Sequence, residues 1–365
     1  MKILVDLRKL SEKPSGIGIY TYNFIKGLME YKELNIIGVT DVMLSYEINK
    51  LNKAGLKIIS YNKKVDKNIE IFKYFNFLDD VIKRENPEIF WEPNMIMPKN
   101  FKKNNPKIKI MLTIHDIFPI TIPEYYSLKY KIYFIHFLKK SIHNCDYIVY
   151  VSNFTKIQTN RYFKESLNKN DFISYNIVNK LESEFKINDY NYFLYIGNIE
   201  KRKGVHILLG AYEEYLKNGG CKSLKIAGNM RDKQIKNKMN DLINKHPNRL
   251  EYLGYIDEKT KCKLIYNCSA FIFPSYAEGF GIPPIEALNI GKRVIVSDLN
   301  IFHEIIKDGC NYFTLDNDYS KSIKNLAKQL NLVDNDFNGN NLFKIDYGEK
   351  KLTKEFVNFI SQINN

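Results

Sequence analysis

The stretch AEGFGIPPIEA, residues 277–287, places two glutamates around a glycine-rich turn. We expect Glu278 in a loop and Glu286 in the first turns of a helix, so their carboxylates can accept hydrogen bonds from hydroxyls on separate parts of one ligand. Gly279 and Gly281 would let backbone N–H groups approach that ligand, because side chains there would block it. A capping glutamate beside an ordinary surface glutamate would explain neither glycine. A pair of glycosidase carboxylates stays open, because the sequence does not give their separation.

This loop is expected between a strand and a helix. The apolar run AFIFPS ends shortly after Pro274, and Pro283 and Pro284 suit a first helical turn, where the missing N–H has no partner to lose. Ligands of parallel sheets bind beyond the carboxyl ends of the strands, so the loop is a candidate site.

A second candidate loop, within YIGNIEKRKGVHILLGAY (195–212), carries three consecutive basic residues between two glycines. Lys201, Arg202 and Lys203 precede a predicted helix, and cations at a helix N-terminus suit the oxygens of a diphosphate. The alternative is a basic turn on the surface. The position after a strand and between glycines favours the binding site.

A third candidate follows the first predicted strand, where Gly16 and Gly18 open a helix whose first N–H groups can face an anion. The pattern approaches the dinucleotide fingerprint G-x-G-x-x-G, and Asp41 follows the next strand, but Thr21 stands in the place of the third glycine. An NAD-binding Rossmann oxidoreductase is therefore an alternative.

A fourth candidate is TIHDIFPITIPE (113–124), in which His115 and Asp116 end a predicted strand. A histidine at this edge of a sheet could donate to a hydroxyl or phosphate of a substrate. A structural histidine that is hydrogen-bonded within the loop explains the spacing equally well.

Composition narrows the class of protein. The chain has 365 residues, a formal net charge of +14 and five cysteines, which are scattered singly. These features favour two domains and an acidic partner, and argue against a zinc site or a disulfide framework. Because we find no signal peptide and no apolar run of membrane-spanning length, we expect a cytoplasmic protein. A nucleic-acid-binding protein would account for the charge but not for the loop at 277–287.

Short β-branched or aromatic runs alternate with helical segments almost throughout the chain, which predicts parallel sheets in two βαβ domains. The polar, aperiodic stretch 178–191 indicates the boundary between them. We expect an N-terminal domain at 1–182 and a C-terminal domain at 183–345, followed by a helix at 346–365. The expected strands lie near residues 2–6, 35–39, 56–60, 88–92, 109–114, 146–151, 172–175, 192–197, 223–228, 249–255, 270–275 and 293–298.

The stretch PSYAEGFGIPPIEALNIGKRVIVSD (274–298) resembles the E-x7-E segment of the retaining glycosyltransferases of family four, the glycosyltransferase group 1 enzymes with the GT-B fold. The resemblance extends to YFLYIGNIEKRKG, to VSNFTK (151–156) and to PSGIGIYTYNFIKGL. Asn198 stands where many members carry an arginine, so Arg202 is expected to supply the guanidinium. Lys292 and Arg293 replace a small residue and a proline, which affects packing more than chemistry.

The resemblance implies two Rossmann-like α/β domains whose parallel sheets face a central cleft, with the C-terminal helix returning to the N-terminal domain. It also implies that Glu286 binds the ribose, that Glu278 binds the donor sugar, and that Arg202 and Lys203 neutralise the departing diphosphate. The implied catalytic residues are His115, Arg202, Lys203 and Glu278. The implied donor-binding residues are Gly16, Gly18, Gly197, Asn198, Arg202, Lys203, Glu278, Gly279, Phe280, Gly281, Ile282 and Glu286.

The expected reaction is sugar transfer with retention at the anomeric carbon, with no metal and no cofactor. Two DND strings, at 316–318 and 334–336, lie in the polar C-terminal region, where Asp and Asn serve turns and helix starts. We therefore expect neither string to hold a metal ion.

GIGIYT together with TIHDIFP resembles the branch of the family that builds bacterial surface polysaccharides, which implies a hexose donor, GDP-mannose in particular, with other nucleotide sugars open. The expected acceptor is a saccharide or lipid-linked saccharide, because the predicted helix at 126–144 mixes aromatic and lysine side chains, which suit an anionic membrane surface. The enzyme would then be peripheral at the inner face of the plasma membrane. The same helix could equally be a core element with lysine ends. A catalytically silent GT-B partner protein is a further alternative, although both glutamates and the basic pair are present.

Overall fold

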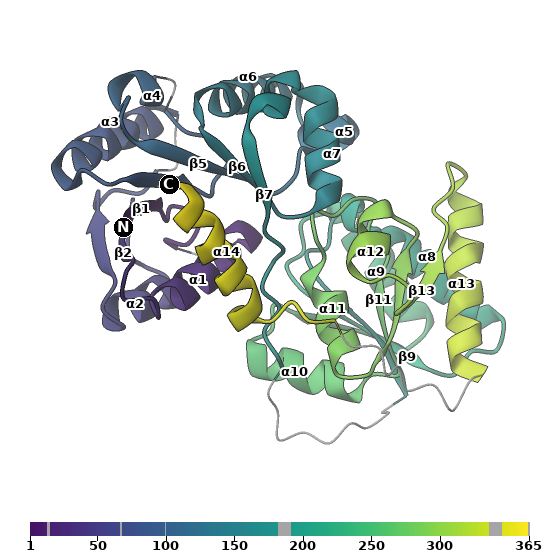
Figure 1. The fold of residues 1–365 in the computed structure, drawn as a ribbon. Helices are drawn as coiled ribbons and strands as arrows, with labels where there is room; N and C mark the ends of the chain where they lie inside the picture. Colours follow the sequence, from purple (N-terminus) through teal and green to yellow (C-terminus); the bar gives the residue numbers. More distant parts are fainter. Residues whose placement is uncertain (13–14, 66–67, 99, 182–190, 336–344, 364–365) are drawn as a thin grey trace. The chain divides into compact units, whose positions relative to one another are not determined.

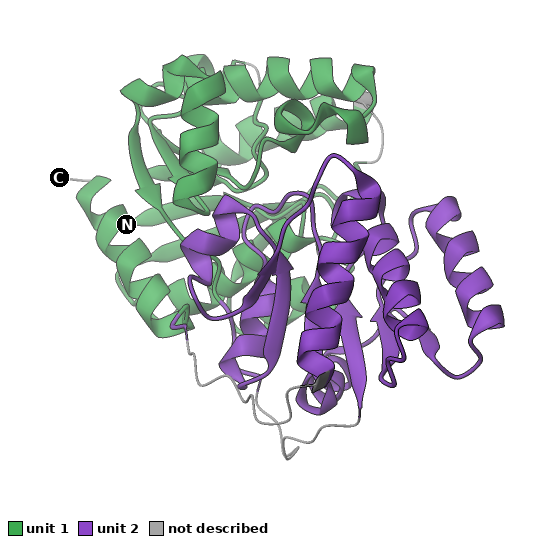
Figure 2. Ribbon diagram, turned by 90° about the vertical axis from the view of Figure 1, so that its right-hand side faces the viewer, with its two compact units in different colours: residues 1–177, 347–365 green, residues 178–346 purple. Residues whose placement is uncertain are grey.

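The computed structural model describes residues 1–12, 15–65, 68–98, 100–181, 191–335 and 345–363. It contains two parallel sheets with helices (Figure 1), the α/β architecture that the alternating sequence predicts. The chain forms two compact units: residues 1–177 with 347–365, and residues 178–346 (Figure 2). The expected boundary between residues 182 and 183 lies outside the described residues.

The first unit is built on a seven-stranded parallel sheet in the order β3-β2-β1-β4-β5-β6-β7. The direction of winding reverses between β1 and β4, and a crevice is expected at the carboxyl ends of these two strands. The strands are β1 (Lys2–Asp6), β2 (Asn35–Thr40), β3 (Lys57–Ser60), β4 (Ile89–Glu92), β5 (Lys109–Ile114), β6 (Tyr147–Tyr150) and β7 (Asn170–Ile173).

The helices of the first unit are α1 (Gly16–Leu28), α2 (Tyr46–Lys53), α3 (Asn68–Glu85), α4 (Phe101–Asn104), α5 (Phe118–Thr121), α6 (Leu128–Asn144), α7 (Asn153–Tyr162) and α14 (Glu349–Ile363), with short 3-10 turns η1 (Pro123–Tyr125) and η2 (Lys164–Asn168). Serine begins several of them. The side chains of Ser15, Ser45, Ser127 and Ser152 each accept a backbone N–H in the first turn of α1, α2, α6 and α7. Such caps satisfy N–H groups that have no partner inside the helix.

Helix α14 packs on α1 within the first unit, where Figure 1 shows the two helices side by side. The ring of Phe356 lies 4.9 Å from that of Phe24 and 5.1 Å from that of Trp91. A side chain at Gly27 would collide with Thr353, so this glycine allows the close approach of the two helices. The return of the C-terminal helix to the N-terminal part of the chain agrees with the fold that the resemblance implies.

The second unit is built on a six-stranded parallel sheet in the order β10-β9-β8-β11-β12-β13. Its strands are β8 (Tyr192–Ile196), β9 (Ser223–Ala227), β10 (Leu250–Gly254), β11 (Ala270–Phe273), β12 (Arg293–Ser297) and β13 (Asn311–Phe313). Its helices are η3 (Lys201–Lys203), α8 (Val205–Lys217), α9 (Lys233–Lys245), α10 (Glu258–Asn267), α11 (Ile282–Asn289), α12 (Asn300–Ile305) and α13 (Tyr319–Asn335).

Every expected strand is present, although β7 occupies 170–173 rather than 172–175. The prediction missed β13, because this strand has three residues, of which only Phe313 is buried. The strand β11, in contrast, is buried along its whole length, as expected for a parallel strand covered on both faces. Among the described residues, no helix combines the length and apolar character that crossing a membrane requires.

Candidate functional site

The candidate site of the second unit lies where its sheet changes direction. Strands β8 and β11 are neighbours, and the next strands along the chain are added on opposite sides of this pair. Loops after such strands meet at one edge of the sheet and form the usual ligand crevice. The basic loop follows β8 and the glycine-rich loop follows β11, so the fold brings these two predicted loops together.

Backbone contacts hold the two loops against each other. Gly204 has a φ of +67°, and a side chain there would collide with the carbonyl oxygen of Pro274. The Arg202 carbonyl accepts the N–H of Tyr276 at 2.9 Å, and Arg202 Nη1 donates to the carbonyl oxygen of Ala277 at 2.8 Å. The guanidinium is therefore fixed beside the loop that carries the first glutamate.

Glu278 is nearly buried, at 7% exposure, and is surrounded by donors. Lys203 Nζ lies 2.6 Å from Glu278 Oε1, and the Ser275 hydroxyl donates to the same oxygen at 2.6 Å. Burial alone would raise the pKa of this carboxyl, but the charges of Lys203 and Arg202 and these hydrogen bonds outweigh burial and hold its pKa below the usual value. Glu278 is therefore a buried, ionised acceptor beside two cationic side chains.

Glu286 is equally buried but has a different cationic partner. It lies in α11, and its Oε1 is 2.8 Å from Nζ of Lys261, a residue of α10. Burial raises the pKa of Glu286 even though Lys261 opposes that shift. The two glutamates thus occupy separate electrostatic environments. That they serve separate parts of one ligand stays a prediction.

The turn between the glutamates is shaped by its glycines. Gly281 has a φ of +105°, in the left-handed region, and caps α11, which starts at Ile282. A side chain at Gly281 would lie 2.7 Å from the ring of Phe302, so close packing and backbone conformation both favour glycine there. Phe280 is 4% exposed, and Gly279 lies between it and Glu278.

At the end of β8, Gly197 is required by packing. A side chain there would lie 2.9 Å from the hydroxyl of Tyr195, and the Gly197 N–H donates to the carbonyl oxygen of Ala227 at 3.0 Å. The Tyr195 hydroxyl donates to the carbonyl oxygen of Asn198 at 2.9 Å, which fixes the start of the basic loop.

The predicted glycines of the first unit open α1, as expected. A side chain at Gly18 would collide with the carbonyl oxygen of Lys9, so local packing explains this glycine. No described atom lies within 4 Å of the Cβ position at Gly16, and a side chain would fit there.

His115, also in the first unit, ends β5 and is buried. Its Nε2 lies 3.0 Å from the carbonyl oxygen of Pro93, which can only accept, so Nε2 carries a proton. Burial lowers its pKa to about 4, and its ring packs edge-on against Tyr20. The bond to Pro93 is the contact that the structural interpretation of the histidine requires. Burial outweighs the opposite effect of this bond on the pKa and keeps the imidazole neutral at neutral pH.

Residues 178–338 match the protein-family model described as glycosyl transferases group 1. This match and the relatives described below support glycosyl transfer as the activity of the chain. The matched segment contains both glutamates, both basic residues and the lysine that pairs with Glu286.

Curated relatives of this glycosyltransferase extend over most of the chain. The O-antigen chain mannosyltransferase RfbU of Salmonella typhimurium is 27% identical over 344 residues, which cover 89% of this chain and 91% of the relative. The O-antigen chain mannosyltransferase B of Escherichia coli is 23% identical, with coverages of 84% and 85%.

The glycosyltransferase also shares its fold with solved structures. Anabaena HepE, crystallised with UDP and glucose, aligns with a TM-score of 0.74 at 14% identity, covering 99% of this chain and 100% of that one. The lipopolysaccharide outer core galactosyltransferase WaaB aligns with a TM-score of 0.68 at 17% identity, covering 99% of each chain. The GT-B fold that the resemblance implies is therefore confirmed.

Sequence reasoning about this glycosyltransferase missed Lys261 and Ser275, which contact the two glutamates. Ser275 adjoins the glycine-rich loop and could have been found there. Lys261 belongs to the charged segment DEKTKCK (257–263), in which no spacing singles it out.

A buried charge cluster in the first unit was also missed. Asp6 ends β1 and Arg8 follows this strand, with Arg8 Nε 2.7 Å from Asp6 Oδ2. Glu92 ends β4, and its Oε2 lies 3.5 Å from Arg8 Nη2. Burial and the neighbouring Asp6 raise the pKa of Glu92, and the charge of Arg8 opposes this shift. These residues lie at the crevice of the first sheet, and the short motif DLR does not reveal their partners.

The DND strings of this glycosyltransferase serve local structure where they are described. Asp316 and Asp318 accept backbone N–H groups at the start of α13, and Asp334 accepts the hydroxyl of Tyr215 at 2.5 Å. Asp336 lies outside the described residues. Across the described ranges, no group of three or more His, Cys, Asp or Glu side chains could hold a metal ion.

Proposed function

We propose that this glycosyltransferase transfers a hexose, mannose, from the nucleoside-diphosphate sugar GDP-mannose to a saccharide acceptor in the synthesis of a cell-surface polysaccharide. The names of the two O-antigen mannosyltransferases that resemble most of the chain support this proposal. The presence of both glutamates and both basic side chains, each held in a defined contact, disfavours a catalytically silent partner protein. The family match to glycosyl transferases disfavours the oxidoreductase alternative.

The observation that carries the proposal is the convergence of Arg202, Lys203 and Glu278 at the carboxyl ends of β8 and β11. In this proposal Arg202 and Lys203 stabilise the negative charge that the departing diphosphate gains, and preorganised cations act most strongly on charge that develops in the transition state. The Lys203 ammonium has three N–H donors, so the bond to Glu278 leaves others for a phosphate oxygen. Glu278 then accepts hydrogen bonds from the hydroxyls of the sugar, beside the bond that breaks.

The proposed reaction retains the configuration at the anomeric carbon. The bond from that carbon to the leaving phosphate oxygen breaks, the acceptor oxygen attacks from the same face, and a leaving phosphate oxygen takes the acceptor proton. Arg202 and Lys203 stabilise the nucleoside diphosphate, and Glu278 orients the sugar. His115 donates no proton at Nε2 to a substrate while that atom is bonded to Pro93, so we assign it to positioning the donor sugar or the acceptor.

The nucleoside part of the donor is assigned to α11 and the glycine-rich turn. Glu286 accepts hydrogen bonds from the ribose hydroxyls. The backbone N–H groups of residues 279–282 donate to sugar or phosphate oxygens. Gly16, Gly18, Gly197 and Asn198 complete the donor-binding residues. The basic pair takes the role that a divalent cation plays in other phosphoryl-leaving reactions, so the proposed transfer needs no metal and no cofactor.

The proposed acceptor is a lipid-linked saccharide at an anionic membrane, and helix α6 supplies the surface for it. Leu128 and Ile132 are 66% and 62% exposed, and Ile135 is also exposed. Lys139 and His143 continue the same side of the helix toward its C-terminal end. Apolar and cationic side chains along one helix suit adsorption to anionic lipid, with apolar groups in the interface and cations at the headgroups.

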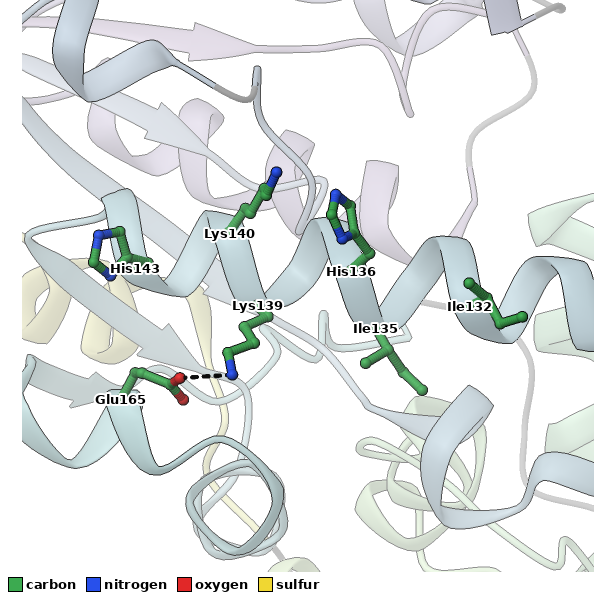
Figure 3. Close-up of a pocket in the computed structure, with 7 residues that line it drawn as sticks. All are labelled: Ile132, Ile135, His136, Lys139, Lys140, His143 and Glu165. Carbon is green, nitrogen blue, oxygen red and sulfur yellow. Dashed lines mark ion pairs between the residues drawn. The ribbon is translucent and has the colours of Figure 1, made fainter.

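Figure 3 shows a hollow along this part of α6, with Lys140 and His136 projecting on one edge of the helix and Lys139 and Ile135 on the other. Glu165 of η2 forms the far wall and pairs with Lys139 at 3.0 Å. One acidic and several basic side chains line the hollow, so its charge favours an anionic headgroup. We propose that the enzyme is peripheral on such a membrane.

A thermal-shift panel tests the proposal. GDP, UDP, ADP and dTDP are added with and without their sugars, because a ligand that binds only the folded state raises the apparent stability. We expect GDP and GDP-mannose to give the largest thermal shifts. In a separate transfer assay we expect mannose to be transferred from GDP-mannose, and NMR of the product should show the α-anomer. NAD is added as a further compound, and a thermal shift with NAD but with none of the four nucleotides would instead support an oxidoreductase. Donor binding without transfer to any saccharide would support the silent partner.

A further inference from the structure

The ion pair between Lys261 and Glu286 links helices α10 and α11, a contact that no pattern in the sequence indicates. Lys261 Nζ lies 2.8 Å from Glu286 Oε1 and also 2.8 Å from Glu258 Oε2, one turn earlier in α10. Glu258 is exposed, whereas the Lys261 side chain is 16% exposed and that of Glu286 is 7% exposed. The lysine is therefore anchored at the surface and carries its charge inward to a buried carboxylate.

The other oxygen of the same carboxylate has no hydrogen-bond partner in the part of the chain that the structure describes. Glu286 Oε2 is buried, and no donor among the described residues reaches it. A buried acceptor without a donor costs about 1–3 kcal/mol, so native proteins rarely keep one unless something else supplies the hydrogen bond. A ligand hydroxyl would satisfy Oε2 while Lys261 keeps Oε1.

Within the described ranges, two charged groups act on Glu286, and both come from α10. Lys261 favours the carboxylate and Glu258 opposes it, while burial favours the neutral acid more strongly than either. The Cys262 thiol lies nearby and stays neutral, because burial raises its pKa. Without the ammonium of Lys261, burial and Glu258 would both act toward protonation of Glu286.

We propose that Lys261 is a positioning residue for the nucleoside end of the donor: it keeps Glu286 ionised and orients the carboxylate so that Oε2 accepts a ribose hydroxyl. This inference rests on the proposed function, which assigns the ribose to Glu286. A protonated Glu286 would present a donor in place of one acceptor and would lose the bond that fixes its rotamer. Lys261 thus contributes to donor affinity without touching the bonds that form or break.

Calorimetric titration of the full-length protein with GDP, between pH 5.5 and 8.5, tests the inference. We expect Lys261→Met to weaken GDP binding by about tenfold near neutral pH, since tenfold in binding corresponds to one unit of pKa. The loss should shrink as the pH rises, because Glu286 then ionises without help. Lys261→Arg should restore both the affinity and the wild-type pH profile, whereas Lys261→Gln, which keeps a hydrogen-bond donor without the charge, should behave like Lys261→Met.

Two control variants separate the role of Lys261 from the assignment of the ribose to Glu286. Lys259→Met, at an exposed position of the same helix, should bind GDP like the wild type. Glu286→Gln should bind GDP weakly at every pH, and wild-type affinity in this variant would refute the ribose assignment itself. Weak binding in Glu286→Gln combined with wild-type affinity and pH profile in Lys261→Met and Lys261→Gln would overturn the role of Lys261 alone. Steady-state kinetics should show a raised KM with little change in kcat, as expected for uniform binding.

Discussion

Lys203 Nζ and Glu278 Oε1 lie 2.6 Å apart, so the cation assigned to the diphosphate and the carboxylate assigned to the sugar form one ion pair. The side chains are 14% and 8% exposed, and the ammonium also lies 5.3 Å from the centre of the Phe273 ring. A phosphate and Glu278 therefore compete for the Lys203 ammonium. Hydroxyls of the sugar can then donate to Glu278 the hydrogen bond that Lys203 gives up. The pair couples recognition of the two halves of the donor.

We expect Glu278→Gln to lower turnover by about a hundredfold, the scale on which single preorganised contacts act in a transition state. Binding of GDP should persist or become tighter, because the substitution releases the charge of Lys203 for the phosphates. Calorimetry with GDP and kinetics with GDP-mannose measure the two effects. Glu251→Gln, at an exposed position of β10, is the matched control. Loss of GDP binding in Glu278→Gln, with binding kept in Glu286→Gln, would reverse the two assignments.

Lys203→Ala should lower both turnover and stability. Turnover should fall by about a hundredfold, because a charge that stabilises the departing diphosphate is gone. The free energy of unfolding should fall by about 3–5 kcal/mol, because Glu278 is left buried without this cation. Arg202→Ala should have the smaller effect on turnover, and thermal unfolding with steady-state kinetics measures both variants.

A second substitution separates the two effects of Lys203. In Lys203→Met/Glu278→Gln no charge is left unpaired at this position, so stability should recover while turnover stays low. Near-wild-type rates in the Arg202→Ala/Lys203→Ala variant would refute the assignment of these side chains to the diphosphate.

His115 should make the stability of the first unit depend on pH. Its pKa is about 4 in the folded protein and about 6.5 in an unfolded chain, so the unfolded state binds the extra proton between these values. The contribution of the neutral His115 to the free energy of unfolding is therefore fully present above pH 6.5. It is lost as the pH drops toward 4, and the loss amounts to about 3 kcal/mol. Urea unfolding can be followed by the fluorescence of Trp91, the single tryptophan, which lies in this unit. His115→Gln should flatten this part of the pH dependence, and an unchanged slope would contradict the burial of a neutral imidazole.

Transfer should survive EDTA, because the basic pair is assigned the leaving-group charge that a metal would otherwise neutralise. The measurement compares initial rates before and after chelation, with magnesium and manganese added back. Loss of activity that either ion restores would point to a metal site and would require the DND strings to be reconsidered.

Binding to vesicles that contain phosphatidylglycerol should weaken as salt rises from 0.1 M to 1 M, because the screening length falls from about 10 Å to about 3 Å. The variant Leu128→Asp/Ile132→Asp should lose most of the binding through its apolar contacts on α6. Leu332→Asp, at an exposed position of α13 in the second unit, is the matched control. Equal loss in the control, or binding that ignores salt and the α6 substitutions, would exclude this helix as the membrane surface.

The sheets and the main loops of the candidate site could be predicted from the sequence because they depend on local patterns. A buried parallel strand such as AFIF is apolar throughout, and Gly281 and the prolines after it mark the turn and the helix start. The short strand β13 has no such pattern. Its pairing with β12 depends on neighbours that the sequence does not show to be adjacent.

Contacts between distant segments could not be predicted. The partners Lys261 and Glu286 come from helices that follow different strands, and only the strand order brings them within 2.8 Å. Gly18 shows the converse case: its position suggested a phosphate loop, but the carbonyl of Lys9 already requires a glycine there. Residue type and spacing therefore identified candidates, whereas the structure adds local packing contacts, such as the one at Gly18, that the spacing does not show.

The placement of α14 has a consequence for synthesis on the ribosome. Residues 178–346 are contiguous, so every segment of the second unit has been translated before residue 347 is added. The first unit includes α14, whose Phe356 packs against Phe24 and Trp91, so it is complete only after residues 349–363 have been translated. The nascent unit therefore exposes apolar side chains that α14 later contacts, Phe24 among them, while the second unit folds. Chaperones that bind exposed apolar surface would have their main target there, and a stop codon a few turns before Ile363 would damage the part of the protein that was made first.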